Sequence, residues 1–528
     1  MEIRAYQVPA EDGGVLVEPA LDVLPGLVRT NAEALRSLDI PLAGRSLSEL
    51  RQATRHAALS AAREHMSRLG LPVPSGPEAH LVVTGHQPAF YHPGVWFKNF
   101  LAHWLARKMG GVPLNVVVDN DEARKPGLDV PFRQEGHSGQ AELLLGPARR
   151  ELPYEEWRLP DPEAPQQFVD GVLSLLDRED MREAFNTFAR YLTEACAKHT
   201  DMATFMTVAR CRYESDFQLS NLELPLSRVC QLPQFGHFFA HLLAELPRFA
   251  ECYNAALEEY RRRRRIRNRA NPLPDLARGD DWVEAPFWLW RAGETRRALR
   301  VGLAGDDRVL RDGDAEVLRL SAGELADGRA VAARLTTLHQ QGYKVRTRAL
   351  TTTLFARLFL GDVFIHGVGG GNYDQITDQI IRTFFAVEPP GYIVASATVC
   401  LPFALKSVSR EEVTRLLYLI RDLQYNPDRH LPPALEQDPE VRSLVKRKWD
   451  QIGRRGRTSL ERREIFVTIR GANAELEAKL GDAPAEVQRA LEEARRALAS
   501  NAVLGSRTYA FCLFPQRLLR EFYRRALP

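Results

Sequence analysis

The sequence predicts an α/β protein with a Rossmann-like parallel sheet core, split by a helix-rich insertion and followed by a helical, hairpin- or coiled-coil-like C-terminal tail. Three observations predict this class. Short apolar runs at 81–84 and 112–118 flank an amphipathic stretch, which is a β-α-β pattern. A second α/β pattern follows much later, at 336–405. Beyond residue 406 the sequence has helical periodicity and many charges.

The first β-α-β unit is the best defined part of the pattern. The run "LVVT" at 81–84 is short, partly β-branched and followed by Gly85, which is typical of a buried strand. A helix is predicted over 95–109, because its apolar residues share one face and Gly110-Gly111 follows. The run at 112–118 is the second strand. We expect the two strands to be parallel and joined by a right-handed crossover.

The rest of the chain is assigned by the same patterns. Residues 25–70 and 166–265 read as helices, 124–165 as loops, and 284–314 as strands and hairpins. Strands are expected at 343–349, 362–366 and 391–403, with "GVGGG" as a flexible loop before a helix. An antiparallel helical hairpin is expected at 473–500. The predicted domains are 1–130, an insertion at 131–335, the second part of the core at 336–405, and a helical domain at 406–528.

Composition excludes some classes of protein. With 71 basic and 68 acidic residues the formal net charge is +3, which argues against a surface that binds nucleic acid throughout. The six cysteines form no C-x-x-C pair, so a zinc knuckle is not expected and no metal ligands are assigned. The start of the chain has no signal-peptide pattern, and no apolar run approaches the ~18 residues of a membrane span. We therefore expect a cytoplasmic protein.

Polar side chains follow both strands of the first unit. His86, Gln87 and His92 come after the first strand, and Asp119 and Asp121 come after the second. Ligands of open α/β sheets bind at the carboxyl ends of the strands, so we expect both groups in one site. The histidines would donate to a phosphate or an adenylate leaving group, and the aspartates would orient an amine, a ribose hydroxyl or hydrated Mg²⁺. The alternative is a set of ordinary loop hydrogen bonds.

The helix between these strands adds two candidates. Gly94 lies at its first turn, where free N–H groups favour a phosphate. Lys98, one turn further, lies off the main apolar face and within reach of such a phosphate, with a solvated surface lysine as the alternative.

A second candidate site follows the strand at 362–366. His366, the glycines Gly369, Gly370 and Gly371, Tyr373 and Asp374 occur in "HGVGGGNYD". The glycines would permit a close approach to a ligand, although the spacing fits neither a P-loop nor a dinucleotide fingerprint. A tight strand-to-helix turn is the alternative.

Two further basic features lie outside these loops. Arg346 and Arg348 alternate on one strand, where they would meet a carboxylate or phosphate or pair with an acidic helix. The dense basic run at 261–269 would contact nucleic acid or form a solvated helix end, and we favour the solvated end.

Two segments together resemble the BshC family, the putative cysteine-adding enzymes of bacillithiol synthesis. They are "TGHQPAFYHPGVWFKN...VPLNVVVDND" and "VRTRALTTTLFARLFLGDVFIHGVGGGNYDQITDQI". The similarity covers about 80–125 and 340–405. His86 replaces a glutamine of that family, the acidic cluster lacks its histidine, and Asn372-Tyr373-Asp374 replaces its glutamate spacing. The chain therefore resembles a divergent relative of the BshC family.

The resemblance implies a Rossmann-like core related to nucleotidyl transferases and class I synthetases. Those proteins carry a His-x-Gly-His loop at the same junction, and "HPGV" keeps His92 and Gly94 without the second histidine. It implies a ligase or transferase that joins an amino acid to an amine such as an amino sugar. The cofactor stays open: ATP or another nucleotide and Mg²⁺ are the candidates.

The leading hypothesis is thus a small-molecule enzyme with no membrane partner and no nucleic acid, and the helical C-terminal domain is a candidate homodimer interface. A metal-assisted hydrolase on the same scaffold, or a non-catalytic RNA- or protein-binding module, is the alternative.

Overall fold

The computed structural model describes residues 4–134, 137–147 and 152–528. The chain divides into two compact units. The first contains residues up to 130, 141–401 and 507–528, and the second contains 131–140 and 402–506. All candidate site residues of the sequence belong to the first unit.

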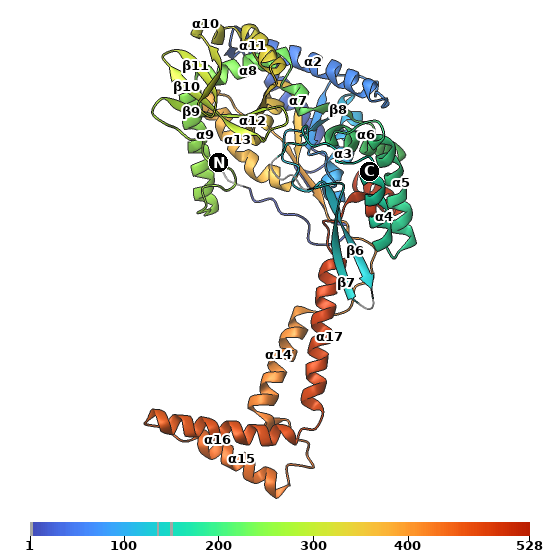
Figure 1. The fold of residues 1–528 in the computed structure, drawn as a ribbon, viewed down its shortest axis with the longest axis vertical. Coiled ribbons are helices and arrows are strands. Elements are labelled where there is room, and N and C mark those ends of the chain that lie inside the picture. The colour runs from blue at the N-terminus through green and yellow to red at the C-terminus, as the bar shows by residue number, and fades with distance from the viewer. Residues whose placement is uncertain (1–3, 135–136, 148–151) are drawn as a thin grey trace. The chain divides into compact units, whose positions relative to one another are not determined.

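A six-stranded sheet forms the centre of the first unit (Figure 1). Its order is β1-β15-β14-β4-β5-β8. The strands are β1 (Val15–Glu18), β15 (Ile393–Ala397), β14 (Val363–His366), β4 (Leu81–His86), β5 (Val112–Val117) and β8 (Leu222–Pro225). All neighbouring pairs from β15 to β8 are parallel, and only β1 is antiparallel to its neighbour. The predicted α/β class with a parallel sheet is confirmed, and its central strands are apolar runs because both faces are covered.

Helix α3 (Pro93–Met109) connects β4 to β5 and packs against β4, β5 and β15. Its start is fixed by Pro93 in the first turn, and its end by Gly110 in a left-handed conformation with φ 60°. On the same sheet, α13 (Val368–Phe384) packs against β14 and β15, and α2 (Leu47–Arg68) packs against β8. The first N-terminal helix is α1 (Leu24–Arg36), which packs against α3 and β14.

The region predicted as an insertion contributes a strand to this sheet. Its helices are α4 (Ala164–Leu175), α5 (Glu179–Cys196), α6 (Met202–Asp216), α7 (Leu226–Val229), α8 (Pro233–Ala244) and α9 (Leu246–Arg264). Between α6 and α7 the four residues of β8 pair with β5. So short a run has no periodicity that distinguishes it from the helices around it, and the sequence analysis missed it.

A separate five-stranded sheet has the order β12-β11-β10-β9-β13 and is antiparallel throughout. Its strands are β9 (Trp282–Arg291), β10 (Arg297–Ala304), β11 (Asp307–Asp312), β12 (Ala315–Leu320) and β13 (Tyr343–Thr347). The hairpins were predicted. Strand β13 was predicted as well, but as part of the parallel core. Its alternation of charged and apolar residues suits a half-buried antiparallel strand beside β9.

Shorter elements complete the first unit. They are β2 (Pro41–Leu42), β3 (Arg45–Ser46), α10 (Ala322–Leu325), α11 (Gly328–Gln340), α12 (Ala349–Phe355), the π-helical turn η1 (Ala356–Leu360), η3 (Phe511–Leu513) and α18 (Gln516–Ala526). Helix α18 packs on α3, so the last part of the predicted tail belongs to the first unit. A two-stranded sheet pairs β6 (Gly127–Gln134) with β7 (His137–Leu144), where the sequence predicted loops, and its residues 131–140 belong to the second unit.

The second unit is mainly helical, as predicted (Figure 1). It contains α14 (Arg410–Tyr425), η2 (Pro427–Arg429), α15 (Pro439–Ile452), α16 (Ser459–Ala478) and α17 (Ala483–Leu504). Helix α15 packs against α16 around Val441, Leu444 and Leu476, and α14 packs against α17. The predicted hairpin of α16 with α17 is therefore replaced by two other pairs. Gly481, with φ 61°, turns the chain between α16 and α17. Among the described residues, no helix has the length and apolar character needed to cross a membrane.

Candidate functional site

The loops after β4 and β5 lie together at the carboxyl edge of the sheet, as the sequence predicts. The register pairs His86 at the end of β4 with Val117 at the end of β5. Just beyond these residues, Gln87 Nε2 donates a hydrogen bond to Asp121 Oδ2 at 2.8 Å. Gln87 is exposed, so this contact lies at the surface of the sheet edge.

His92 caps the N-terminus of α3. Its Nδ1 accepts a hydrogen bond from the N–H of Gly94 at 3.1 Å. Burial, together with the charges of Arg507 and Lys98, lowers the pKa of His92 to about 4, so the ring is neutral at pH 7. Gly94 is required for close packing, because a Cβ there would lie 2.0 Å from the carbonyl oxygen of Ala397 at the end of β15.

Lys98 is not the solvated lysine that the sequence allowed. Its side chain is 5% exposed, and Nζ donates to the carbonyl oxygen of Gly85 at 2.7 Å. Burial alone lowers its pKa to about 7. Within the described residues Lys98 forms no ion pair, which is rare for a buried lysine. A buried amine that is not compensated by a carboxylate is typical of a functional site.

Arg507 joins this group from the far end of the sequence. Its Nη2 donates to the carbonyl oxygen of Ala397 at 2.7 Å and to Ser396 Oγ at 3.3 Å. Its Nε has no partner, and no ion pair of Arg507 occurs in the part of the chain described. We call Lys98 and Arg507, which lie with the neutral ring of His92 at the start of α3, the cationic cluster. Sequence reasoning missed Arg507 because no motif surrounds it and about 400 residues separate it from Lys98.

His86 is buried beneath the cationic cluster. Its Nε2 lies 3.1 Å from Asn99 Oδ1, and Asn99 Nδ2 donates to Glu214 Oε1 at 2.7 Å. Nδ1 of His86 lies 3.2 Å from the carbonyl oxygen of Gln87, so each ring nitrogen faces an acceptor and either one can carry the hydrogen. Burial and the nearby charge of Lys98 hold the pKa of His86 well below its usual value. His86 is therefore a neutral donor fixed in the core.

A buried ionic network anchors Asn99. Arg210 Nη1 donates to Glu214 at 2.7 Å and Arg210 Nη2 to Glu223 at 2.5 Å. Burial raises the pKa of Glu223 to about 7. The ligand atoms of Cys211, Glu214 and Glu223 lie within 4.8 Å of one another, the geometry of a metal trio. Arg210 already neutralises both carboxylates, so the trio does not favour a cation.

The acidic loop after β5 is held in place by hydrogen bonds. Asp119 accepts from the N–H of Ser227 at 2.9 Å and from its hydroxyl at 2.5 Å. Burial, followed by the charge of Glu155, raises the pKa of Asp119 to about 7. Asp121 pairs with Arg296 at 2.9 Å, and Asn120 Nδ2 donates to the carbonyl oxygen of Thr347 at 2.8 Å. Asp121 thus keeps an ion pair and a contact with Gln87.

The second predicted site lies at the end of β14. His366 Nε2 is 2.9 Å from Asp374 Oδ2, and Asp374 also accepts from Arg357 and Thr353 at 2.7 Å each. These partners hold the pKa of Asp374 well below its usual range despite its burial. Asp374 is fully buried and Arg357 nearly so, which makes this group a core anchor.

The predicted glycine loop is instead the first turn of α13. Gly369, Gly370 and Gly371 are helical, and Gly371 permits contact with β15, since a Cβ there would lie 2.3 Å from Val394. Tyr373 follows on this helix. Burial and the charges of Asp374 and Asp121 raise its pKa to about 12.

The remaining basic candidates have acidic partners. Arg346 forms a two-point ion pair with Glu155, with both contacts at 3.0 Å. Arg348 pairs with Glu284 of β9. In the basic run, Arg261 pairs with Asp275 at 2.6 Å, while Arg262 and Arg263 pair with Glu259. The acidic partners of Arg346 and Arg348 lie in a turn and on strand β9, not on a helix as the sequence alternative had it.

No protein-family model matches the chain, and no curated protein shows significant similarity to it.

Proposed function

We propose that the protein is a ligase- or transferase-like enzyme that binds the phosphate of a nucleotide or phosphorylated substrate at the cationic cluster. The observation that carries the proposal is Lys98, a buried amine with a carbonyl partner but no carboxylate. A phosphate would supply the missing negative charge. The N-terminus of α3 adds the positive end of a helix dipole, although its first N–H groups already donate to His92.

Polar side chains at the carboxyl edge of the sheet suit the binding of a second substrate. Gln87, Asp121 and Tyr373 present an amide, a carboxylate and a hydroxyl, which would orient an amine. In the proposed reaction the amine attacks an activated carbon, a C–N bond forms, and the phosphate-bearing group leaves towards Lys98. Electrostatic stabilisation of that leaving group would be the main contribution of the cationic cluster.

The resemblance to the BshC family supports the same class of reaction, with a Rossmann-like core, a nucleotide such as ATP, and an amino acid and amino-sugar-like amine as substrates. We extend the proposal to a cytoplasmic enzyme that forms a homodimer through its second unit. Apolar side chains exposed there support this, among them Tyr418, Leu460, Phe466 and Val467. Metal-assisted hydrolysis receives less support, because Ser227 and Arg296 already engage Asp119 and Asp121.

The proposal can be tested by measuring whether the protein takes up a proton when it binds an anion. Sulfate is a suitable probe because it does not titrate near neutral pH. At pH 8 the amine of Lys98 is mostly neutral, so a bound sulfate would raise its pKa and draw a proton from solution. Calorimetry in two buffers of different ionisation enthalpy measures this uptake, and titration with ATP follows.

We expect uptake of up to about one proton per sulfate in the wild type. Lys98→Met should abolish both binding and uptake, and the matched change Lys198→Met, at an exposed lysine, should alter neither. Sulfate and ATP binding without proton uptake, or uptake that persists in Lys98→Met, would overturn the assignment. So would the absence of any binding by the wild type.

A further inference from the structure

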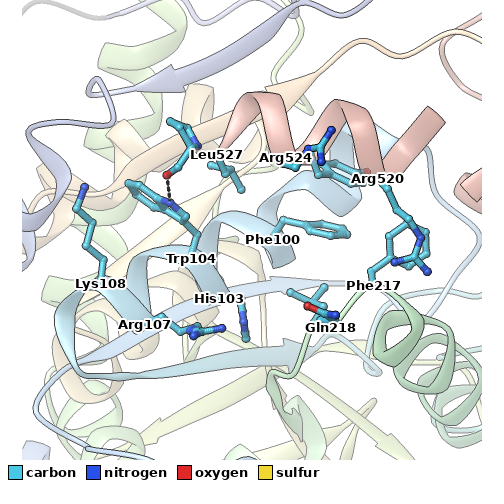
Figure 2. Close-up of a pocket in the computed structure, with 13 residues that line it drawn as sticks. Phe100, His103, Trp104, Arg107, Lys108, Phe217, Gln218, Arg520, Arg524 and Leu527 are labelled. Atoms are coloured by element: carbon cyan, nitrogen blue, oxygen red, sulfur yellow. Dashed lines mark hydrogen bonds between the residues drawn. The ribbon is translucent and has the colours of Figure 1, made fainter. Parts of the chain in front are cut away.

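An open groove lies along the second half of α3, away from the cationic cluster (Figure 2). Helix α18 forms one wall, and the chain just after α6 forms the other. Its volume is about 840 Å³. No residue of the cationic cluster lines the groove.

The charged side chains that line the groove are all basic. Arg107, Lys108, Arg520 and Arg524 are exposed, and no Asp or Glu side chain lines the groove. Within the described residues, none of these four forms an ion pair. In this they differ from the basic run on α9, whose Arg261, Arg262 and Arg263 have acidic partners. A groove lined by basic side chains without acidic partners has a focused positive potential, which attracts anions.

Aromatic rings alternate with these charges. Lys108 Nζ lies 4.7 Å from the centre of the Trp104 ring, and the guanidinium of Arg520 lies 4.6 Å from that of Phe217. Between them Phe100 stacks on Tyr523, with ring centres 3.8 Å apart. Trp104 is held in position because its Nε1 donates to the Pro528 oxygen at 3.0 Å. Figure 2 shows Phe100, Trp104 and Phe217 along the groove, together with the basic side chains that line it.

We propose that this groove binds single-stranded nucleic acid. Rings beside cations are the recurring features of such sites, since bases stack on the rings while the cations contact phosphates. An acidic peptide would use the charges but has no base to stack. A duplex would present phosphates, but its bases are already stacked on one another. The inference is independent of the proposed function, because no residue is shared with the cationic cluster.

The basic surface continues beyond the groove, which favours a strand over a single nucleotide. An adjoining hollow is lined by Gln516, Arg517, Arg520, Glu521 and Arg524. Arg517, Arg520 and Arg524 recur at spacings of three and four residues and so share one face of α18. Arg517 is held by Glu521 at 2.9 Å, which leaves Arg520 and Arg524 as the principal phosphate contacts.

Fluorescence anisotropy with the full-length protein and a labelled twelve-nucleotide oligo(dT) tests this proposal. We expect Arg520→Glu/Arg524→Glu to weaken binding about tenfold or more. The log–log salt slope should also fall by about 1.4, which is about 0.7 for each of two lost phosphate contacts. Trp104→Leu keeps an apolar side chain but removes the ring, and it should weaken binding about fivefold or more by removing a stacking surface.

Matched controls separate the groove from charge in general. Arg262→Glu/Arg263→Glu makes the same change of charge on α9 and should leave the affinity within about twofold, and Lys98→Met should also leave it unchanged. Equal losses in the α9 variant would overturn the proposal, as would a wild type that does not bind the oligonucleotide. The proposal would also fail if a duplex or heparin, which offer no free bases, competed as well as unlabelled oligo(dT). The same holds for AMP, which is a single nucleotide and not a strand.

Discussion

The side-chain amide of Gln87 donates to Asp121 at 2.8 Å and so joins the loops that follow β4 and β5. Asp121 is also held by Arg296 at 2.9 Å, and its Oδ1 accepts from the N–H of Glu122. The candidate site is therefore shaped by one exposed hydrogen bond between two loops that the parallel register brings together.

Changing the donor in this hydrogen bond should expose its role. Gln87→Ala should lower the free energy of unfolding by about 1 kcal/mol. Gln87→Glu should cost more, because it places a second carboxylate against Asp121. Urea unfolding at pH 7 measures both. Gln52→Glu, an exposed change on α2, is the control; an equal loss there would show that the contact has no role.

Lys98 should give the stability a distinctive pH dependence. Its pKa is about 7 in the folded protein and 10.5 when unperturbed. Between these values the unfolded chain holds a proton that the folded protein has lost, so this contribution to stability rises with pH, by up to about 1.4 kcal/mol per pH unit. Below pH 7 Lys98 is protonated in both states, so the stability of the folded protein is lowered by the full cost of burying the charged amine.

Lys98→Met removes that cost without leaving a cavity. We expect the variant to be more stable than the wild type at pH 6, with the advantage shrinking towards pH 10. Denaturant unfolding of both proteins across this range gives the difference, and Lys198→Met serves as the exposed control. A constant difference between wild type and Lys98→Met at every pH would show that Lys98 does not titrate as described.

The sequence analysis succeeded where one local pattern decides the structure. Helix α3 could be placed by its apolar face, by Pro93 and by Gly110, and the parallel strands β4 and β5 followed from the crossover. It failed where a long-range partner decides. Strand β8 joins the sheet as only four residues, and the alternation in β13 suits an antiparallel strand but does not identify β9 as its partner.

The same distinction applies to the candidate site. Gln87 and Asp121 could be brought together from sequence because each directly follows one of two adjacent strands. The burial of Lys98 and the arrival of Arg507 depend on tertiary packing. The partners of Arg346 and Arg348, which are Glu155 and Glu284, could not be identified from sequence because they are distant along the chain.

Asp119 should give a pH dependence at lower pH, with the opposite sign. Its pKa is raised from 3.8 to about 7, so between these values the folded protein holds a proton that the unfolded chain has lost. Stability from this group therefore falls as pH rises from about 4 to 7. Asp119→Asn keeps an acceptor for the Ser227 N–H and removes the charge. We expect this variant to gain stability over the wild type from pH 4 to pH 7.

Thermal unfolding at pH 4, 5.5 and 7 checks this expectation, with the exposed change Asp39→Asn as the control. If Asp119→Asn lost stability at pH 7 relative to pH 4, the carboxylate would have to be charged in the folded protein.

Two neighbouring glycines of α13 should respond in opposite directions to the same substitution. A Cβ at Gly369 meets nothing within 4 Å, whereas one at Gly371 would lie 2.3 Å from Val394. Gly369→Ala should stabilise the protein by about 0.5–1 kcal/mol, because alanine loses less backbone entropy on folding. Gly371→Ala should destabilise it by about 1–3 kcal/mol, because α13 must move away from β15. Urea unfolding of the two variants measures both; a stabilising Gly371→Ala would mean that the glycines serve a flexible loop, as the sequence alone suggested.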